Sequence, residues 1–249
     1  MIQCIERFVS VDKDWVPYQR GFSLYIRPTY ISMTNQLGIL PPKEAKIFTI
    51  LSPVGPYFST GFTAIKIVCS ENIMRSWPGG FGYAKLGANY GPTLQYFKKI
   101  KDQGYHQILW LIDDVVTEVG VMNFFVFWTN KQGEKELITC PLDGTILPGV
   151  VRDSVITLCK EWGIKVSERH FTIHELIDSV KEGRFHEAFG TGTAAIICPI
   201  KEISFKNTHY ALFKDQNQNV GELGSKLYNY LLDIQTGVVK HPWSRAISH

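Results

Sequence analysis

An apolar stretch over residues 119–130 most constrains what this chain can fold into. It reads VGVMNFFVFWTN and is followed by Lys131-Gln132-Gly133 and by a second strand-like stretch over residues 134–140 (EKELITC). Two such stretches joined across a short turn that contains glycine are typical of an antiparallel hairpin. The sequence therefore predicts two paired, buried strands here, and the rest of the fold must cover them.

Short apolar strand patterns alternate with helical patterns along the rest of the chain. Helix 172–182 should open with a capping box made by Thr172 and Glu175. The glycines of residues 190–193 are expected to interrupt the chain before its last strand. Together these patterns predict a mixed α/β (α+β) fold. The remaining strands are expected at 23–33, 45–52, 63–69, 106–113, 165–171, 185–188 and 195–205, and the helices at 3–11, 89–102, 150–162, 172–182 and 221–236.

Proline and glycine cluster between two of the predicted strands. The segment Pro53-Val54-Gly55-Pro56-Tyr57 is followed by Ser59-Thr60-Gly61. Such a density of proline and glycine favours an ordered linker. We therefore expect an interdomain loop at 53–64, a small domain at 1–52 and a large domain at 65–249.

Composition excludes several classes of protein. The chain has 249 residues, is 45% hydrophobic and carries a net charge of +3 with both signs interspersed. A sizeable core can form, and no basic stripe exists for nucleic acid. No apolar run approaches the roughly 20 residues of a membrane span. The start lacks the features of a signal peptide, so a cytoplasmic location is expected.

Cysteine and histidine spacing gives no sign of a metal site. The five cysteines include no CxxC or CxxH pair, and the seven histidines show no HExxH or paired spacing. Free, buried, small apolar cysteines in a reducing compartment are the favoured interpretation. The sequence therefore predicts neither a disulfide framework nor a bound metal ion.

Two charged residues are candidates for chemistry. Lys85 lies among glycine and small residues, where a ligand can approach the backbone closely, and a desolvated lysine can act as a nucleophile. Glu118 enters the apolar stretch, so it is either a strand-end surface charge or buried beside a positive partner. A buried carboxylate facing a ring nitrogen would keep that nitrogen protonated. On composition alone, an ordinary surface role is the more common outcome for both residues.

Two segments are candidate anion cradles. Residues 147–152 (LPGVVR) run from a turn into a predicted helix, and residues 190–194 (GTGTA) offer backbone N–H groups and two hydroxyls. Helix N-termini and glycine-rich turns bind phosphate through backbone donors. Each pattern is weak by itself, and neither is a Walker A loop or a GxGxxG motif.

Several motifs in the right order resemble the branched-chain amino acid aminotransferases of the fold-type IV pyridoxal-phosphate family. The likeness extends from Cys4 to Trp243, nearly the whole chain. It rests on VDKDWVP at 11–17, SLYIRP at 23–28, SPVGPYF at 52–58, KLGANYG at 85–91, TEVG at 117–120, ILPGVVR at 146–152 and GTGTA at 190–194.

The resemblance implies pyridoxal 5'-phosphate as the cofactor. It implies that Lys85 forms a Schiff base with the cofactor and moves the proton during catalysis. Glu118 would pair with the pyridine nitrogen and Tyr90 with the phenolic oxygen. The cofactor's phosphate would be held by the amides of Val150 and Val151 and by the Thr193 hydroxyl.

The resemblance also implies the substrates and their contacts. The amino group of leucine, isoleucine or valine would pass to 2-oxoglutarate. Tyr25 and Arg27 correspond to substrate-side residues, and the amides of Thr193 and Ala194 would receive the substrate carboxylate. Family members are homodimers, so we expect a homodimer with small-molecule substrates and no nucleic-acid or membrane partner.

The likeness starts part-way along the family's sequence. The family's preceding stretch supplies most of its small domain and an arginine to the cofactor phosphate, so an N-terminally truncated chain, with a C-terminal remnant of the small domain, is expected. A catalytically weak or inactive isoform that dimerises or regulates is the alternative, and a missing transit peptide would make the location mitochondrial. A third interpretation is a D-amino acid aminotransferase or aminodeoxychorismate lyase, against which the stretches around Trp15 and at 117–120 argue.

Overall fold

The computed structural model describes residues 1–55, 62–213 and 220–247, and its residues form two compact units. One unit comprises Met1–Tyr57 with Ile234–His249, and the other comprises Phe58–Asp233. Of the expected interdomain loop at 53–64, residues 56–61 lie outside the described residues. The predicted domain limits stay a prediction.

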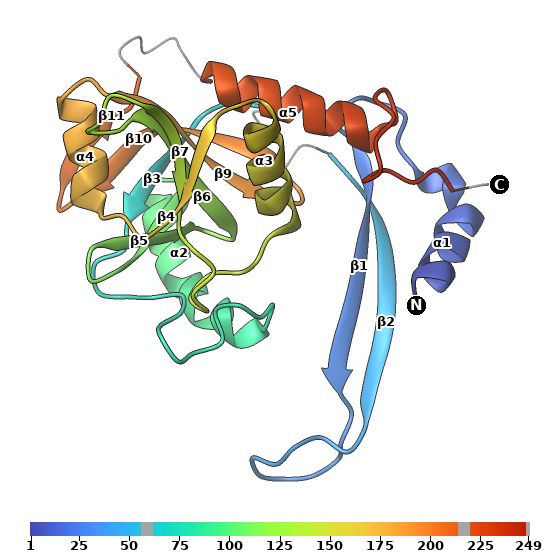
Figure 1. Ribbon diagram of the computed structural model, residues 1–249. Helices are drawn as coiled ribbons and strands as arrows, with labels where there is room; N and C mark the ends of the chain where they lie inside the picture. The colour runs from blue at the N-terminus through green and yellow to red at the C-terminus, as the bar shows by residue number, and fades with distance from the viewer. Residues whose placement is uncertain (56–61, 214–219, 248–249) are drawn as a thin grey trace. The chain divides into compact units, whose positions relative to one another are not determined.

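The first unit holds helix α1 and the two-stranded sheet of β1 and β2 (Figure 1). Helix α1, Ile2–Val11, and a 3₁₀ turn, Lys13–Trp15, precede strands β1, Ser23–Ser32, and β2, Ala45–Val54. The strands are antiparallel, and Ser23 lies opposite Val54. All three main elements were predicted within two residues at their ends. None of their residues is buried.

The second unit is built on a nine-stranded sheet, six of whose strands close into a ring. Strand β9 pairs with both β10 and β6, and the path β10-β3-β4-β5-β6 joins those two strands by another route. A closed ring leaves none of its members with a free edge. The strands are β3 (Ile65–Cys69), β4 (Gln107–Ile112), β5 (Val115–Val119), β6 (Met122–Thr129), β7 (Lys135–Thr139), β8 (Lys165–Glu168), β9 (Phe185–Gly192), β10 (Ile196–Phe205) and β11 (Thr208–Ala211).

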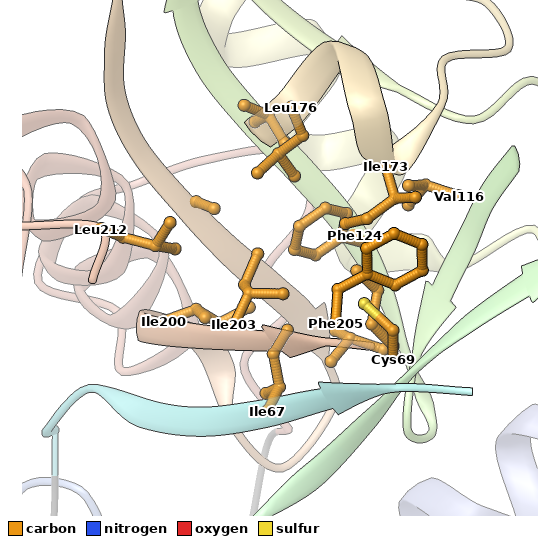
Figure 2. Packing of buried hydrophobic residues seen from close by; sticks show 14 of the residues in the cluster. Ile67, Cys69, Val116, Phe124, Ile173, Leu176, Ile200, Ile203, Phe205 and Leu212 are labelled. Atoms are coloured by element: carbon orange, nitrogen blue, oxygen red, sulfur yellow. The ribbon is translucent and has the colours of Figure 1, made fainter. Parts of the chain in front are cut away.

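Two apolar clusters use the two faces of these strands. One contains alternate residues of the ring, such as Phe124, together with Ile173 and Leu176 of helix α4 (Figure 2). The other contains Phe125 and Phe189 and is covered by helices α3 and α5. Successive strand residues point to opposite faces, so neighbouring phenylalanines serve different clusters. The helices are α2 (Leu94–Asp102), α3 (Val150–Glu161), α4 (Ile173–Lys181) and α5 (Glu222–Gln235).

Most predicted elements of this unit are confirmed, including two with local chemical signals. The hairpin of β6 and β7 places Thr129 opposite Lys135. The capping box of α4 is present, since the Glu175 N–H donates to the Thr172 hydroxyl at 3.1 Å and the Thr172 N–H donates to the Glu175 carboxylate at 2.9 Å. Both features depend on residues close together in the sequence.

Four predictions need correction. The strand predicted over 119–130 begins at Met122 as β6, and residues 115–119 form a separate strand, β5. Strand β11 was not predicted. The helix expected over 89–102 begins only at Leu94, after 3₁₀ turns at Gly87–Asn89 and Gly91–Thr93. The strand expected at 165–171 ends at Glu168. Among the cysteines, Cys4 is exposed and the other four are buried.

The predicted interruption at 190–193 was also wrong, because Gly190 and Gly192 belong to β9 and the turn lies at 193–195. Packing explains the first glycine. A Cβ on Gly190 would lie 2.8 Å from Val119 Cγ1 and 3.0 Å from Met122 Cε. The absence of a side chain at Gly190 therefore lets β9 pack closely against the side chains of Val119 and Met122. Among the described residues, no helix is both long and apolar enough to cross a membrane.

Gly190→Ala should lower the free energy of unfolding by about 1–3 kcal/mol, because the added methyl group overpacks the core beside Val119 and Met122. Urea denaturation measures the change. Gly91→Ala is the matched control, since no atom lies within 4 Å of its added Cβ, and it should change stability by less than about 0.5 kcal/mol. Equal effects of the two substitutions would contradict the packing role of Gly190.

Candidate active site

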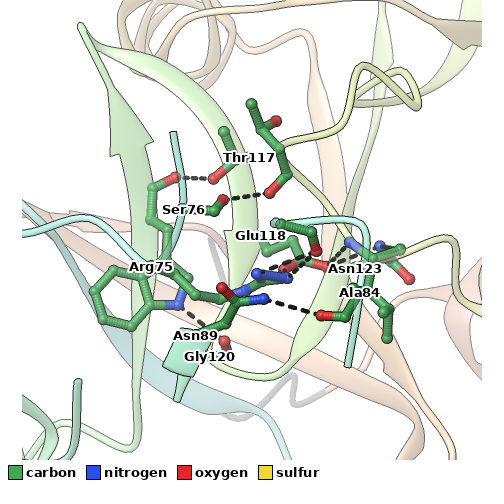
Figure 3. Close-up of polar contacts among 12 residues, drawn as sticks. Arg75, Ser76, Ala84, Asn89, Thr117, Glu118, Gly120 and Asn123 are labelled. Carbon is green, nitrogen blue, oxygen red and sulfur yellow. Dashed lines mark hydrogen bonds and ion pairs between the residues drawn. The ribbon is translucent and has the colours of Figure 1, made fainter. Parts of the chain in front are cut away.

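A buried carboxylate on β5 is the centre of the candidate site. Glu118 is only 3% exposed. Its Oε2 accepts a hydrogen bond from Nε of Arg75 at 2.6 Å and forms an ion pair with Nη2 of the same guanidinium at 2.5 Å. Its Oε1 accepts from Nδ2 of Asn123 and from the N–H of Leu147, both at 3.1 Å (Figure 3). Of the two alternatives left open for Glu118, the structure shows burial beside a positive partner.

Arg75 joins this carboxylate to the loop that carries Lys85. It is 4% exposed and lies in the segment after β3, and its Nη2 also donates to the Gly82 carbonyl at 3.0 Å. Arg75 was not among the site residues predicted from the sequence. The sequence held one indication of such a residue: a buried glutamate requires a cationic or hydrogen-bonding partner.

The environment of Glu118 changes its acidity. Burial raises the pKa of Glu118 to about 7, while Arg75, the Leu147 N–H and Lys85 each act in the opposite direction. The Lys85 contribution shows that its charge lies within electrostatic reach of the carboxylate. Glu118 is thus a carboxyl group whose charge responds to small changes near neutral pH.

Lys85 and Tyr90 lie beside each other. Lys85 Nζ is 5.8 Å from the centroid of the Tyr90 ring, and the Arg75 guanidinium is at the same distance from that ring. Burial raises the pKa of Tyr90; Arg75 lowers it and Glu118 raises it further. Lys85 itself is exposed. The structure therefore brings three of the predicted site residues together.

Asn89 shapes the loop before Lys85. Its side-chain amide is buried and donates to the carbonyls of Phe81 and Ala84, at 2.7 and 2.9 Å. These bonds tie residues 81–84 to the 3₁₀ turn that precedes Tyr90. Lys85 is thus presented from a loop with fixed neighbours on both sides.

The N-terminus of α3 lies next to the Glu118 cluster. Leu147, which donates to Glu118, is followed by Gly149, the N-cap of a helix without a side-chain cap. The amides of Val150 and Val151, in the first turn of α3, have no partner within the helix. A Cβ on Gly149 would overlap Asn123 Oδ1, so only glycine lets the helix begin this close to Asn123. This end of α3 is suited to an anion.

Thr193 and Ala194 lie on the exposed turn between β9 and β10. Two residues earlier, Thr191 is 2% exposed and its hydroxyl oxygen has no hydrogen-bond partner. Thr191 lies opposite Asn123 across β9 and β6, so both side chains share the sheet face on which Gly149 approaches Asn123. Thr191 was not among the predicted site residues, although it lies within the GTGTA motif at 190–194.

Tyr25 and Arg27 belong to the first unit. Both lie on β1, opposite Ser52 and Ile50 of β2, and the Arg27 guanidinium lies 5.0 Å from the centroid of the Tyr25 ring. The site around Glu118 is described within the second unit alone. The expected role of Tyr25 and Arg27 beside a substrate stays a prediction.

The sequence matches the model of one protein family, amino-transferase class IV, over residues 5–203. The chain belongs to this family. A branched-chain-amino-acid aminotransferase of Dictyostelium discoideum is 48% identical over 98% of this chain and 65% of its own length. The mitochondrial enzyme of Schizosaccharomyces pombe is 47% identical, with 98% of this chain and 59% of that protein covered. This chain therefore spans about three fifths of the length of these relatives.

Solved structures show the same fold. The branched-chain aminotransferase of Thermoproteus uzoniensis, crystallised with norvaline, gives a TM-score of 0.72 at 23% identity, covering 96% of this chain and 71% of that chain. Another branched-chain amino acid aminotransferase, crystallised with pyridoxamine 5'-phosphate, gives 0.74 at 24% identity with the same coverage. The fold is thus that of the fold-type IV aminotransferases, as the resemblance implied.

The raised pKa of Glu118 predicts how stability depends on pH. Between pH 4.5 and about 7 this carboxyl group is ionised to a smaller extent in the native chain than in the unfolded one. The native state then binds more protons, so this group's contribution to stability falls as pH rises through the window. As pH rises from 4.5 to about 7, the free energy of unfolding of Glu118→Gln should increase by roughly 3 kcal/mol relative to that of the parent. Urea denaturation at several pH values measures the change.

Glu134→Gln is the control for this experiment. Glu134 is exposed, and its hydrogen bond with Lys165 lowers the pKa of its carboxyl group, so its stabilising contribution is lost as pH falls. Its pH dependence should have the opposite sign. A stability difference between Glu118→Gln and the parent that stays constant from pH 4.5 to 7 would disprove the assigned shift.

Proposed function

We propose that this chain transfers the amino group of leucine, isoleucine or valine to 2-oxoglutarate, with pyridoxal 5'-phosphate as cofactor. The observation that carries the proposal is the grouping of Lys85 and Tyr90 with the buried carboxylate of Glu118. Membership of amino-transferase class IV and the names of the relatives support this reaction and these substrates.

The residues present fit this cofactor at both of its ends. The uncapped N-terminus of α3 and the unpartnered hydroxyl of Thr191 are donors suited to a phosphate. Glu118 is an acceptor suited to a protonated ring nitrogen. We propose that the phosphate is held by Val150, Val151 and Thr193, the ring by Glu118 and Tyr90, and the carbonyl carbon by Lys85.

When bound, pyridoxal phosphate supplies an electron sink for the charge that forms as the substrate α-carbon loses its proton. Glu118 keeps a proton on the ring nitrogen, because a carboxylate is stabilised by the positive charge it faces. The carboxylate already accepts three hydrogen bonds and forms an ion pair with Arg75. The Asn123 amide has a second acceptor, the Leu147 carbonyl at 2.8 Å, so it can give up its weaker bond to Glu118 when a ring N–H arrives.

Lys85 moves the proton in this proposal. Its Nζ would take the proton from the substrate α-carbon and deliver it to the C4′ carbon of the cofactor, two atoms further along, which is general acid–base catalysis. Its exposed position in a loop fixed by Asn89 leaves the amine free to alternate between its roles as nucleophile and as base. The positive charges of Arg75 and Lys85 both lie near the Tyr90 ring. They would favour the anionic form of the cofactor's phenolic oxygen, which Tyr90 is proposed to bind.

The substrate contacts and the assembly are part of the same proposal. The amides of Thr193 and Ala194 receive the substrate carboxylate, and Tyr25 and Arg27 lie on the substrate side. The pocket must accept a branched apolar side chain in one half-reaction and a carboxylate in the other. We propose a homodimer in the cytoplasm; the relatives include both cytosolic and mitochondrial forms.

The test of function is a transamination assay on the purified chain with added pyridoxal phosphate. Leucine, isoleucine and valine should each drive the formation of glutamate from 2-oxoglutarate, and D-leucine should not. Glutamate is measured by an enzyme-coupled assay. If D-leucine reacts as well as leucine, the substrate proposal fails.

Lys85→Ala should lower the rate of glutamate formation by about 100-fold to 10,000-fold, because it removes the acid–base group. It should also remove the long-wavelength absorption of the bound cofactor, while circular dichroism shows an unchanged fold. Lys98→Ala, at an exposed position of α2, is the matched control and should keep both signals. Full activity in Lys85→Ala would refute the role of this amine.

A further inference from the structure

We propose that Cys140, Asp143 and His170 form a binding site for a zinc-class divalent metal ion, separate from the site around Glu118 and Lys85. Among the described residues, a ligand atom from each of these three side chains lies within 4.8 Å of the other two. His170 Nε2 is 3.4 Å from Asp143 Oδ2. The argument for the site does not rest on the proposed aminotransferase reaction.

Strand register brings the three residues together. Strands β7 and β8 are parallel, with Thr139 opposite Glu168, and the Arg169 N–H donates to the Thr139 carbonyl at 3.1 Å. Cys140 follows β7 directly, and His170 lies two residues beyond β8. Sequence spacing could not reveal this pair, because its members are 30 positions apart.

The ligand chemistry favours zinc over magnesium or calcium. A thiolate, an imidazole and a carboxylate are the three ligand types that zinc prefers, whereas magnesium and calcium take oxygen ligands. Metal–ligand distances of about 2.0–2.3 Å place the ligand atoms of a tetrahedral site roughly 3.3–3.8 Å apart. The observed spread needs only small side-chain adjustments, and three protein ligands leave the fourth position to water.

The surroundings orient the ligands and leave an entrance. Asp143 Oδ1 accepts hydrogen bonds from the N–H and the hydroxyl of Thr145, at 2.9 and 2.6 Å, which leaves Oδ2 for the ion. The Cys140 residue is buried, but the side chains of His170 and Asp143 are 54% and 27% exposed. An ion can therefore arrive from solvent on the side of Asp143 and His170.

Two features oppose binding of the ion, and each is offset by another property of the site. Burial raises the pKa of the Cys140 thiol to about 12, so the ion must displace a proton, as metal ions do when a thiol coordinates them. Arg152 donates to the Cys140 carbonyl at 2.9 Å, but the same guanidinium nitrogen is paired with Glu168 at 2.9 Å. Its charge is thus largely balanced.

The test is zinc binding by the purified full chain, measured by isothermal titration and by metal content after dialysis. One ion per chain is expected for the parent, and magnesium should not compete. Cobalt(II) should add a sulfur-to-cobalt charge-transfer band to the spectrum. His170→Ala, which truncates an exposed side chain, and Cys140→Ala should each weaken binding by at least about 100-fold and abolish the band.

His174→Ala and Cys159→Ala are the matched controls. His174 is also exposed and lies 3.1 Å from a carboxylate, that of Asp114, while Cys159 is also buried, and both variants should bind zinc as the parent does. Zinc should raise the melting temperature of the parent and of both controls but not that of His170→Ala. No binding by the parent, or unchanged binding by folded His170→Ala or Cys140→Ala, would overturn the proposal.

Discussion

The buried ion pair of Arg75 and Glu118 is the interaction on which the rest of the site depends. Each charge costs several kcal/mol to remove from water, and a pair recovers this cost only when its remaining hydrogen-bonding positions are also satisfied. Here the Asn123 amide and the Leu147 N–H satisfy the second carboxylate oxygen, and the Gly82 carbonyl accepts from the guanidinium. Strands β5 and β6, the Lys85 loop and the segment before α3 are thereby tied to one carboxylate.

This arrangement couples the two ends of the proposed cofactor site. Asn123 donates to Glu118, approaches Gly149 at the N-cap of α3, and lies opposite Thr191 on β9. The Asn123 side chain on β6 thus contacts Glu118, which is proposed to bind the cofactor ring. It also approaches Gly149, which directly precedes the amides proposed to bind the phosphate. A change in the tilt of α3 would therefore reach Glu118 through the hydrogen bonds that Asn123 and Leu147 donate to it.

What the sequence could predict was local. The β6–β7 hairpin and the capping box of Thr172 and Glu175 have their signals within a few residues, and both are confirmed. Lys85 and Glu118 were candidates from their surroundings in the sequence, whereas Tyr90 and the roles of all three came from motifs that resemble a family. Arg75 was missed because it lies 43 positions from Glu118, and only the pairing of β4 with both β3 and β5 in the sheet brings their segments together. The interruption expected at 190–193 failed because glycine there serves close packing rather than a turn.

The metal cluster and the carboxylate cluster share one loop, and this makes them physically coupled. Residues 140–149 connect β7 to α3 and supply Cys140 and Asp143 to one cluster and the Leu147 N–H to the other. The same loop supports the segment that carries Arg75 and Lys85, since the Gly144 carbonyl accepts from the Tyr83 N–H and the Thr145 carbonyl accepts from the Ser76 hydroxyl. An ion that fixes Asp143 would restrict this loop while touching no residue of the proposed cofactor site, so its effect would reach Lys85 through backbone position rather than through charge.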